Sequence, residues 1–302
     1  MNTPARAPVR RSIRLKEWRP SQDALLQPTP AYLAATDGSL TDAACRLRTD
    51  GNGFILAPET LDHFEESLVF LGDSFVESVY VPEDKRFPAA TQSTLRSAGL
   101  GVHCLNGGYS GATTLHLLLA LLAKVGRSPH TSVCLVVPSN DALALAKKGG
   151  YWCRDDARYS PIVPIPESAK AGNQPFDVAD LTSVLNLFVD TCRRLRLGLI
   201  LATFPHRTAS FESDPWLQRR FATAANYARL HSVRARVNDA VRAVARRLAL
   251  PLLDFDAQLS TRTTLFYDDL HLNVSGSERA AELVADAWLK HRAAPSPVQV
   301  AP

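Results

Sequence analysis

The stretch SLVFLGDS, residues 67–74, begins as an apolar run and ends in a Gly-Asp-Ser turn. Such a run, without polar alternation, is typical of a strand that is covered on both faces of a sheet. A serine directly after the strand lies at its carboxyl end, the edge where open α/β sheets place their functional groups. The stretch therefore predicts a buried parallel strand over 67–71 and an accessible hydroxyl at Ser74.

Further apolar runs along the chain extend this strand into a sheet. They cover residues 102–105, 132–137, 197–203 and 251–255. Helical spacing of apolar residues predicts helices over 87–98, 114–125, 179–195 and around 233–248, and a last helix that opens with the capping-box pattern SGSE at 275–278. Strands that alternate with helices form a parallel sheet with helices on both faces. We therefore expect an α/β fold, with one doubly wound, five-stranded domain over residues 61–292.

Four segments do not fit this alternation of strands and helices: the two ends of the chain and two insertions. Residues 1–60 are predicted to form an N-terminal extension, a basic arm followed by a probable hairpin at the turn signal DGNG, 50–53. The insertions, at about 147–176 and 206–230, follow strands at the functional edge. Each is a candidate for a lid or substrate wall, or equally for a decorative loop. The Pro-rich tail, residues 293–302, is expected to be disordered.

The charge distribution argues against a nucleic-acid partner. The net charge is +4, yet residues 1–19 hold six basic residues and one acidic residue, so the rest of the chain is near neutral. We interpret the arm as a solvated terminus rather than a binding surface. No run approaches the roughly eighteen apolar residues of a bilayer span. The N-terminus also lacks the apolar core of a secretory signal, and an organelle transit peptide is a minor alternative.

The cysteines and the metal motifs point to a cytoplasmic protein without a cofactor. The five cysteines are odd in number and widely spread, without a C-x-x-C pair, which fits a reducing cytoplasm. No HxH, HExxH or Cys/His spacing predicts a metal site. No P-loop and no G-x-G-x-x-G motif predicts a nucleotide. We therefore expect no cofactor.

Motifs that suit acyl chemistry follow the first three predicted strands. After the Gly-Asp-Ser turn come NGGYSGAT, residues 106–113, and PSND, residues 138–141. Glycine allows backbone N–H groups to approach a developing oxyanion, and an asparagine amide can add another donor. Asn140 has a second interpretation, as the cap of the next helix. Phe75 and Val76 follow Ser74, so the chain lacks the G-x-S-x-G elbow of α/β-hydrolases.

The motif DDLHLN, residues 268–273, supplies a base together with its partner. A serine hydroxyl becomes nucleophilic when a neutral imidazole takes its proton, and that imidazole needs an acceptor on its far nitrogen. On a turn that leads into a helix, positions i and i+3 share a face. We therefore expect Asp268, rather than Asp269, to face His271. Asp73 is expected to accept hydrogen bonds from the turn backbone.

With these four motifs in order over about residues 65–290, the chain resembles the SGNH hydrolase superfamily, the GDSL esterases and lipases. The resemblance implies a three-layer α/β/α sandwich with a site open at the surface. It implies that Ser74 is the nucleophile, His271 the general base and Asp268 the residue that orients His271. It also implies an oxyanion hole formed by the backbone N–H groups of Ser74 and Gly111 and the side-chain amide of Asn140.

The chain departs from this family pattern at three places. Pro138 stands where the third motif normally has glycine, which predicts a differently shaped pocket near Asn140. The β-branched stretch 76–80 after the nucleophile predicts little helix-dipole support for Ser74. The N-terminal extension lies outside the resemblance.

The sequence thus predicts a serine esterase that acts through an acyl-enzyme on Ser74. The expected substrate is a short or mid-length O-acyl group on a carbohydrate or metabolite. An O-acyltransferase with the same Ser-His-Asp site is one alternative, and a non-catalytic binding protein on the same fold is another. His206, after the fourth strand, is a tentative substrate contact, with a solvated loop residue as its other interpretation. The oligomeric state is left open.

Overall fold

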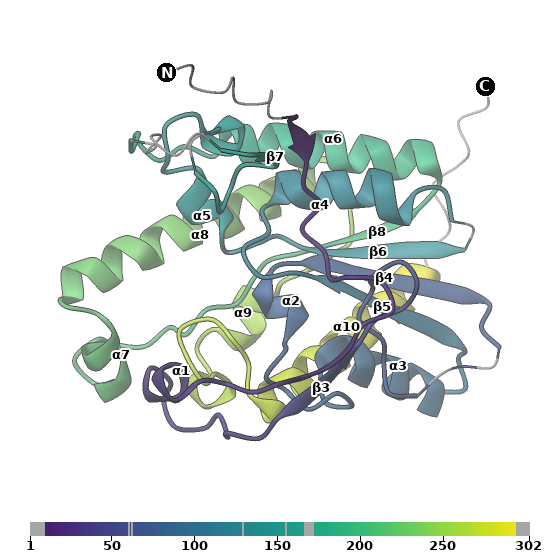
Figure 1. Ribbon diagram of the computed structural model, residues 1–302, viewed down its shortest axis with the longest axis horizontal. Helices are drawn as coiled ribbons and strands as arrows, with labels where there is room; N and C mark the ends of the chain where they lie inside the picture. Colours follow the sequence, from purple (N-terminus) through teal and green to yellow (C-terminus); the bar gives the residue numbers. More distant parts are fainter. Residues whose placement is uncertain are drawn as a thin grey trace, which may run out of the picture.

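The computed structural model describes most of the chain, namely residues 10–59, 61, 63–128, 130–154, 156–165 and 172–293. Its centre is a five-stranded parallel sheet in the order β5-β4-β6-β8-β9 (Figure 1). The strands are β4 (Glu66–Gly72), β5 (Val102–Gly108), β6 (Thr131–Val136), β8 (Gly198–Ala202) and β9 (Leu252–Leu253). The predicted parallel, five-stranded α/β fold is confirmed. The predicted tail lies outside the described residues beyond Ala293, as does the arm before Arg10.

Helices cover both faces of the sheet. One layer contains α3 (Phe87–Ser97) and α10 (Val274–Ala293), which pack on each other (Figure 1). The opposite layer contains α4 (Thr114–Ala120), α6 (Ala179–Leu195) and α8 (Ala224–Arg247). The arrangement is therefore the expected three-layer sandwich.

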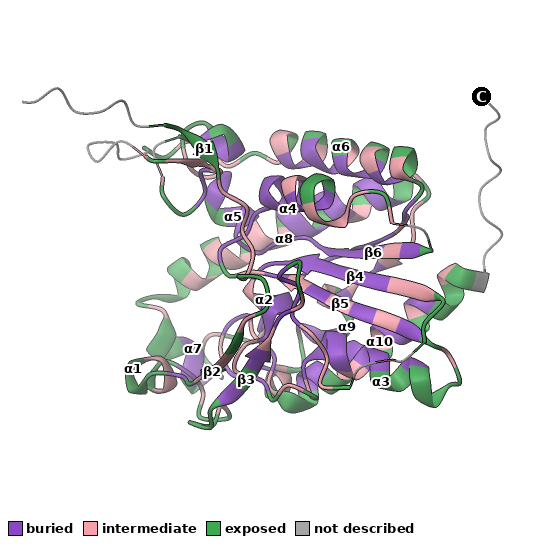
Figure 2. Cartoon of the chain, turned by 45° about the vertical axis from the view of Figure 1, so that its right-hand side comes forward, coloured by how far each residue is buried: buried purple, intermediate pink, exposed green. Residues whose placement is uncertain are grey.

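The core explains why the apolar runs become strands. Leu68, Phe70 and Leu71 of β4 are fully buried, and Figure 2 shows the central strands largely in the colour of buried residues. Phe70 packs edge-on against Phe87 of α3 with ring centroids 5.6 Å apart. Burial of one such side chain contributes roughly 1.5–3 kcal/mol. The sandwich is therefore held mainly by apolar contacts between the central strands and both helix layers.

The sheet register aligns the strand ends that carry the motifs. In the parallel ladders, Gly72 pairs with Gly108 and Leu71 with Leu135. The segments that leave β4, β5 and β6 therefore emerge side by side at one edge, which we call the carboxyl edge. Short helices follow two of them, α2 (Ser74–Glu77) after β4 and α5 (Asp141–Ala144) after β6.

Some helix boundaries differ from the predicted ones. The helix expected over 114–125 is α4 followed by a π-turn, Leu121–Val125, which closes where the Gly126 N–H donates to Leu121 O. The SGSE capping box was wrong: α10 begins at Val274, and the Asn273 side chain accepts the Gly276 N–H at 3.1 Å. Asn273 and Ser275 both offer a capping side chain. Asn273, which directly follows the bridge residue Leu272, is the one that caps the helix.

The two insertions carry short elements of their own. The first contains a 3-10 turn, Gly150–Trp152, and β7 (Ile162–Val163). The second contains α7 (Pro215–Arg220), and its residues 224–230 already belong to α8. A short helix, α9 (Phe255–Leu259), and a 3-10 turn, Thr263–Leu265, follow β9.

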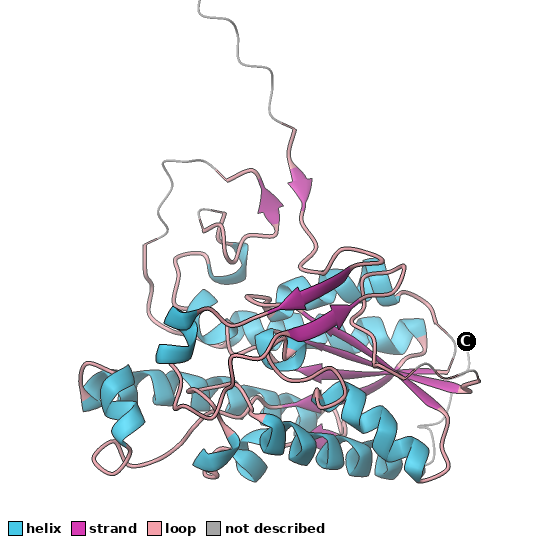
Figure 3. Ribbon diagram, turned by 60° about the horizontal axis from the view of Figure 1, so that its bottom comes forward, coloured by secondary structure: helices cyan, strands magenta, loops and turns pink. Residues whose placement is uncertain are grey.

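The N-terminal extension runs across the domain and packs on it. Its β1 (Ser12–Ile13) pairs antiparallel with β7 of the first insertion, away from the main sheet (Figure 3). Its β2 (Asp23–Leu26) pairs antiparallel with β3 (Cys45–Arg48), and α1 (Pro30–Ala34) lies between them in the chain. The DGNG segment forms a turn, since the Gly53 N–H donates to Asp50 O at 3.1 Å. The turn reverses the chain after β3, because Thr49 pairs antiparallel with Ile55 and the Leu56 N–H donates to Arg48 O at 2.9 Å, so the segment forms a hairpin that does not include β2.

Two further features concern the character of the helices and the state of the cysteines. Within the described residues, no helix combines the length and the apolar character needed to cross a membrane. All five cysteines are buried and free, so none forms a disulfide.

Candidate active site

Ser74 opens α2 directly after the carboxyl end of β4. A Cβ on Gly72 would lie 2.2 Å from a methyl group of Val76, so the tight turn requires glycine there. Asp73 caps α2, because its Oδ1 accepts the Phe75 N–H at 3.0 Å. The helix is only one turn long. The turn thus presents the hydroxyl of Ser74 at the carboxyl edge.

The chain brings His271 and Asp268 to this hydroxyl. His271 Nε2 lies 2.8 Å from Ser74 Oγ, and His271 Nδ1 lies 2.7 Å from Asp268 Oδ2. The other carboxylate oxygen of Asp268 accepts the backbone N–H groups of Leu270 and His271 at 2.8 and 2.6 Å. The imidazole also stacks on the ring of Tyr267 with an interplanar angle of 10°. Both the carboxylate and the imidazole are thus held from two directions.

The electrostatic setting of His271 favours the imidazolium. Burial lowers the pKa of His271, but the charge and hydrogen bond of Asp268, with the charges of Asp73 and Asp269, outweigh burial and raise the pKa to about 9. A site of this kind stabilises the positive charge that forms when the imidazole takes a proton from Ser74.

Asp269 points to a different partner. Its Oδ2 accepts a hydrogen bond from Arg234 Nη2 at 2.6 Å, and both side chains are nearly buried. Burial alone would raise the pKa of Asp269, but the charge and hydrogen bond of Arg234 lower it overall. The structure thus places Asp268 against His271 and turns Asp269 away, as the i, i+3 spacing indicates.

Two backbone donors at the carboxyl edge have no acceptor in the described part of the protein. The N–H groups of Ser74 and Gly111 donate to none of its acceptor atoms. Gly111 has φ +75°, which glycine adopts without strain. The neighbouring Gly108 is required for close packing, because a Cβ there would lie 2.3 Å from Glu77 N. The two N–H groups thus follow adjacent strands and are free to bind a ligand oxygen.

Asn140 is tied to the Ser74 turn and does not cap α5 with its side chain. Its Nδ2 donates to Asp73 Oδ2 at 3.0 Å, and the same oxygen accepts both the N–H and the hydroxyl of Ser139 at 2.9 Å. An amide group carries two hydrogens, so one is left for another acceptor. Asp73 therefore joins the segments after β4 and β6, and accepts backbone N–H groups as the sequence indicates.

Residues of the N-terminal extension and Glu77 also contact this site, and the sequence did not predict these contacts. Tyr32 OH lies 3.5 Å from Asp268 Oδ2. Trp18 Nε1 donates to Glu77 Oε1 at 2.9 Å, and the Ser110 hydroxyl donates to Glu77 Oε2 at 2.5 Å. Burial raises the pKa of Glu77. Its place one helical turn after Ser74 is a sequence signal, whereas the contacts of Tyr32 and Trp18 depend on long-range packing.

His206 is not brought into this arrangement. It is 2% exposed, its ring packs edge-on against His231 with centroids 4.8 Å apart, and its Nδ1 lies 3.6 Å from Asp256 Oδ1. Within the described ranges it makes no hydrogen bond or ring contact with Ser74, Asp268 or His271. Burial, with the charge of Arg234, lowers the pKa of His206 to about 3. The ring is therefore a neutral, enclosed group, and the predicted substrate contact is not part of the assembled site.

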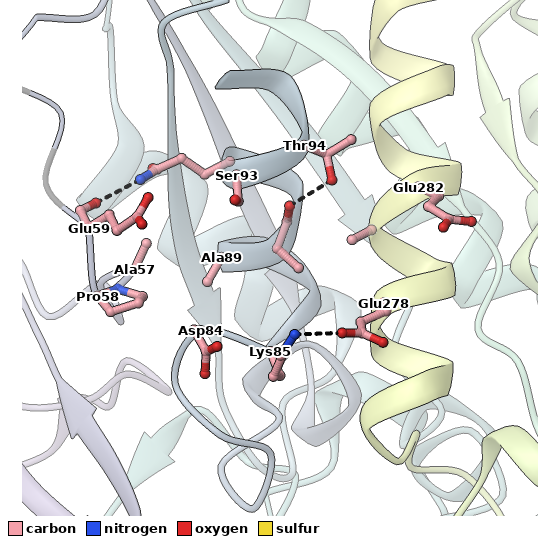
Figure 4. A pocket seen from close by; sticks show the side chains of 13 residues that line it. Ala57, Pro58, Glu59, Asp84, Lys85, Ala89, Ser93, Thr94, Glu278 and Glu282 are labelled. Carbon is pink, nitrogen blue, oxygen red and sulfur yellow. Dashed lines mark hydrogen bonds and ion pairs between the residues drawn. The ribbon is translucent and has the colours of Figure 1, made fainter. Parts of the chain in front are cut away.

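A groove of about 410 Å³ lies elsewhere on the molecule, between α3, α10 and the segment 57–59 (Figure 4). Glu59, Asp84, Lys85 and Glu278 line it, and Lys85 Nζ pairs with Glu278 at 2.7 Å. None of the candidate site residues does so. In the described part of the chain, no group of three or more His, Cys, Asp or Glu side chains is placed to hold a metal ion.

Comparisons with known proteins concern the family and the fold. The family model described as GDSL-like Lipase/Acylhydrolase family matches residues 70–279. No curated protein matches the chain. Among solved structures, the acetyl xylan esterase AlAXEase is 15% identical, with a TM-score of 0.52 over 73% of this chain and 98% of that chain. TesA is 16% identical, with a TM-score of 0.49 over 75% and 99%.

A further solved structure is a catalytic mutant of Axe2, an acetylxylan esterase from Geobacillus stearothermophilus. It is 17% identical, with a TM-score of 0.48 over 77% of this chain and 96% of that chain. At such identities a structural likeness speaks to the fold alone, and AlAXEase, with the TM-score above 0.5, supports the α/β sandwich assigned here.

Proposed function

The chain belongs to the GDSL-like lipase/acylhydrolase family and is a carboxylic ester hydrolase, and on that premise we propose that it cleaves its ester through an acyl-enzyme on Ser74. The observation that carries the proposal is the continuous hydrogen-bonded chain from Ser74 Oγ through His271 to Asp268, at 2.8 and 2.7 Å. Such a chain has the geometry of a nucleophile, its base and the group that orients the base.

In the first half-reaction, Ser74 Oγ attacks the ester carbonyl carbon while His271 Nε2 takes the hydroxyl proton. Asp268 accepts a hydrogen bond from Nδ1–H, which fixes the tautomer and stabilises the imidazolium. His271 then gives the proton to the departing alcohol. In the second half-reaction, His271 takes a proton from water, the water oxygen attacks the acyl carbonyl, and the acid leaves as Ser74 regains its proton.

We assign the oxyanion of the tetrahedral intermediate to three donors. They are the N–H groups of Ser74 and Gly111 and the second amide hydrogen of Asn140. The hydrogen bond from Asn140 to Asp73 supports this role, because it holds the amide beside the Ser74 turn. Each such donor contributes on the order of 3 kcal/mol to lowering the barrier.

The substrate we propose is a short or mid-length O-acyl group on a carbohydrate or a metabolite. Acetyl is the first acyl group to test, because the fold neighbour AlAXEase is described as an acetyl xylan esterase. Labelling with a fluorophosphonate probe, which forms a stable adduct with an activated serine, tests the nucleophile. We expect labelling of the wild type and none of Ser74→Ala; equal labelling of both would overturn the proposal.

An O-acyltransferase with the same site is the second candidate. The observation in its favour is that β1 of the N-terminal extension pairs with β7 of the first insertion, and that Lys16 and Arg158 of these two segments lie against Gly111. Cover over a site favours transfer to a bound hydroxyl over transfer to water. Product analysis with an acetyl ester, with and without a sugar acceptor, separates the two, since only a transferase forms the new ester.

We also propose a cytoplasmic location, on the basis of the five free, buried cysteines. Fractionation of the source cells tests it. Recovery of the protein outside the cytoplasm would contradict it.

A further inference from the structure

Cationic side chains converge on Gly111, whose N–H is one of the proposed oxyanion donors. A Cβ built on Gly111 would lie 3.2 Å from Lys16 Nζ and 3.7 Å from both Cγ and Nε of Arg158. The two side chains therefore reach the same point from different segments. The charge of Arg14 acts on Lys16 as well.

Backbone pairing between the N-terminal extension, which lies outside the family match, and the first insertion, which lies inside it, holds these cations in place. Lys16 and Arg14 belong to the N-terminal extension, which ends before residue 70, where the match begins. Arg158 belongs to the first insertion. The pairing of β1 with β7 joins the two segments, and Arg14 adds bonds from its N–H to Pro161 O and from Nη2 to Ala157 O, both at 2.7 Å. The convergence is thus built by backbone pairing and does not depend on flexible side chains alone.

Among the described residues, no carboxylate forms an ion pair with Lys16 or Arg158. Arg207, Arg234 and Arg242, by contrast, each pair with a carboxylate within 2.8 Å. In the ranges that the structure describes, Arg14 Nε is buried without a hydrogen-bond partner.

One carboxylate lies near enough to act on Lys16, and it is engaged elsewhere. Glu77 accepts hydrogen bonds from Trp18 and Ser110, and burial raises its pKa, which disfavours its charged form. Burial, together with the charges of Arg14 and Arg158, lowers the pKa of Lys16 to about 8 against the opposing effect of Glu77. An ammonium group in such a setting is stabilised when an anion arrives.

Aromatic contacts do not offset this imbalance. Lys16 Nζ lies 5.8 Å from the centroid of Tyr109, and Arg158 lies 5.8 Å from that of Tyr159. Both distances are close to the limit of about 6 Å for a cation–π interaction. Lys16 is half-buried and Arg158 is exposed, so both cations remain accessible to a ligand anion.

We propose that Lys16 and Arg158 form an anion subsite beside the oxyanion loop, so that the substrate is an acyl ester carrying a carboxylate, sulfate or phosphate close to the scissile bond. This inference rests on the proposed esterase function. Arg158 can bind a planar or tetrahedral oxyanion through two N–H groups, and Lys16 supplies a point charge on its other side. The extension and the insertion thereby select a charged ester, while the sandwich carries out the cleavage.

The test compares esters that differ by one charge. On the alcohol side, 4-carboxyphenyl acetate is paired with 4-carbamoylphenyl acetate; on the acyl side, 4-nitrophenyl hydrogen adipate is paired with its methyl ester. We expect Lys16→Met and Arg158→Met to lower kcat/KM for a charged ester about tenfold, and for its neutral partner by less than about twofold. The pair that responds identifies the side of the scissile bond on which the anion lies.

Lys290→Met is the matched control for a lost positive charge. Lys290 lies in the last turn of α10, near Arg292, which pairs with Glu66 at the start of β4. Ser74 follows the other end of that seven-residue strand, roughly 20 Å away. We therefore expect Lys290→Met to leave the charged-to-neutral ratio unchanged.

The pH dependence of KM adds a second readout. The charged groups that act on Lys16 are Arg14 on its own segment, Arg158 of the insertion and Glu77 of α2, and Lys16 in turn acts on His116 of α4. Since Lys16 is cationic below its pKa, KM for the charged ester should rise as the pH passes through about 8. KM for the neutral ester should not, and Lys16→Met should abolish the difference.

Binding separates failure of the subsite from failure of the enzyme. Ser74→Ala is titrated calorimetrically with 4-acetamidobenzoate and with 4-acetamidobenzamide, neither of which requires turnover. Preferential binding of the carboxylate that Lys16→Met abolishes supports the subsite even if no ester is cleaved. Equal binding of the two, or equal loss of kcat/KM for charged and neutral esters in both variants, overturns it while Ser74-dependent labelling still supports the esterase.

Discussion

The charged side chains on the two sides of the candidate site differ in whether they form ion pairs. On the His271 side, each ionised group has a partner: Asp268 binds His271, and Asp269 binds Arg234. On the Gly111 side, Lys16 and Arg158 converge without an ion pair in the described part of the chain. The first side belongs to the α/β sandwich and the second to additions to it. The sandwich therefore holds its reacting groups in a fixed arrangement. The N-terminal extension and the first insertion, by contrast, provide positive charges that a ligand can neutralise.

Replacement of Ser74 should have the largest effect, because it removes the group that His271 activates. Ser74→Ala removes the nucleophile, and we expect kcat for ester cleavage to fall on the order of 10⁶-fold. Steady-state turnover of 4-nitrophenyl acetate measures the change. Ser97→Ala, an exposed serine at the end of α3, is the control and should keep wild-type kcat. Activity in Ser74→Ala close to that of the control would contradict the account.

Replacement of Asp268 should mainly lower kcat, whereas replacement of Asp269 should mainly lower the free energy of unfolding. Asp268→Asn should lower kcat on the order of 10⁴-fold, because an amide cannot hold His271 in the reactive tautomer. Asp269→Asn should change kcat by less than about threefold but lower the free energy of unfolding by about 2 kcal/mol, since Arg234 loses its anionic partner. Kinetics and chemical denaturation measure the two effects. The reverse pattern would show that the orienting residue is misassigned.

The proposed oxyanion donor gives the next largest effect. Asn140→Ala removes one donor to the intermediate, so kcat should fall about 10²–10³-fold with little change in KM. The unfolding midpoint should be recorded as well, because Asp73 loses a hydrogen bond. A higher KM at unchanged kcat would instead mean that Asn140 contributes ground-state binding.

The raised pKa of His271 predicts an alkaline rate profile. The base must be neutral to take the Ser74 proton, and the charge and hydrogen bond of Asp268 hold its pKa at about 9 against the effect of burial. For a neutral ester, kcat/KM should therefore rise about tenfold per pH unit below pH 9 and level off above it. Asp268→Asn should move the inflection to lower pH. A flat profile between pH 6 and 9 would be inconsistent with this setting.

The smallest effect is expected for Tyr32, the contact of the extension on the His271 side. Tyr32→Phe removes a hydroxyl that lies 3.5 Å from Asp268 Oδ2, near the limit of a hydrogen bond. We expect kcat to fall by less than about threefold. A much larger loss, without a change in the unfolding midpoint, would make Tyr32 a positioning residue for Asp268.

The sequence predicted the sandwich well because its strands are continuous apolar runs. Residues 67–71 and 102–105 lie inside β4 and β5, and the helix predicted over 179–195 coincides with α6. The placement of Ser74 and Gly111 at one edge followed from the parallel order of these strands. The prediction that Asp268, and not Asp269, contacts His271 followed from the i, i+3 spacing. Such spacing depends only on the local backbone, so the sequence is enough to predict it.

The remaining features depend on contacts that local patterns do not encode. SGSE and Asn273 are competing caps, and the sequence alone does not rank them. Lys16 and Trp18 lie in a segment without periodicity, and long-range contacts hold them at the site, among them the pairing of β1 with β7 and the hydrogen bond from Trp18 to Glu77. His206 was predicted from its position after a strand, but packing against His231 encloses it.

Capture of the acyl-enzyme tests the central claim most directly. The protein is mixed with 4-nitrophenyl acetate, quenched in acid within milliseconds, digested and examined by mass spectrometry. The account predicts one acetyl group on the peptide that contains Ser74, formed faster than steady-state turnover and lost on further incubation. Acetylation at another residue, or turnover without any acyl group on Ser74, would contradict it.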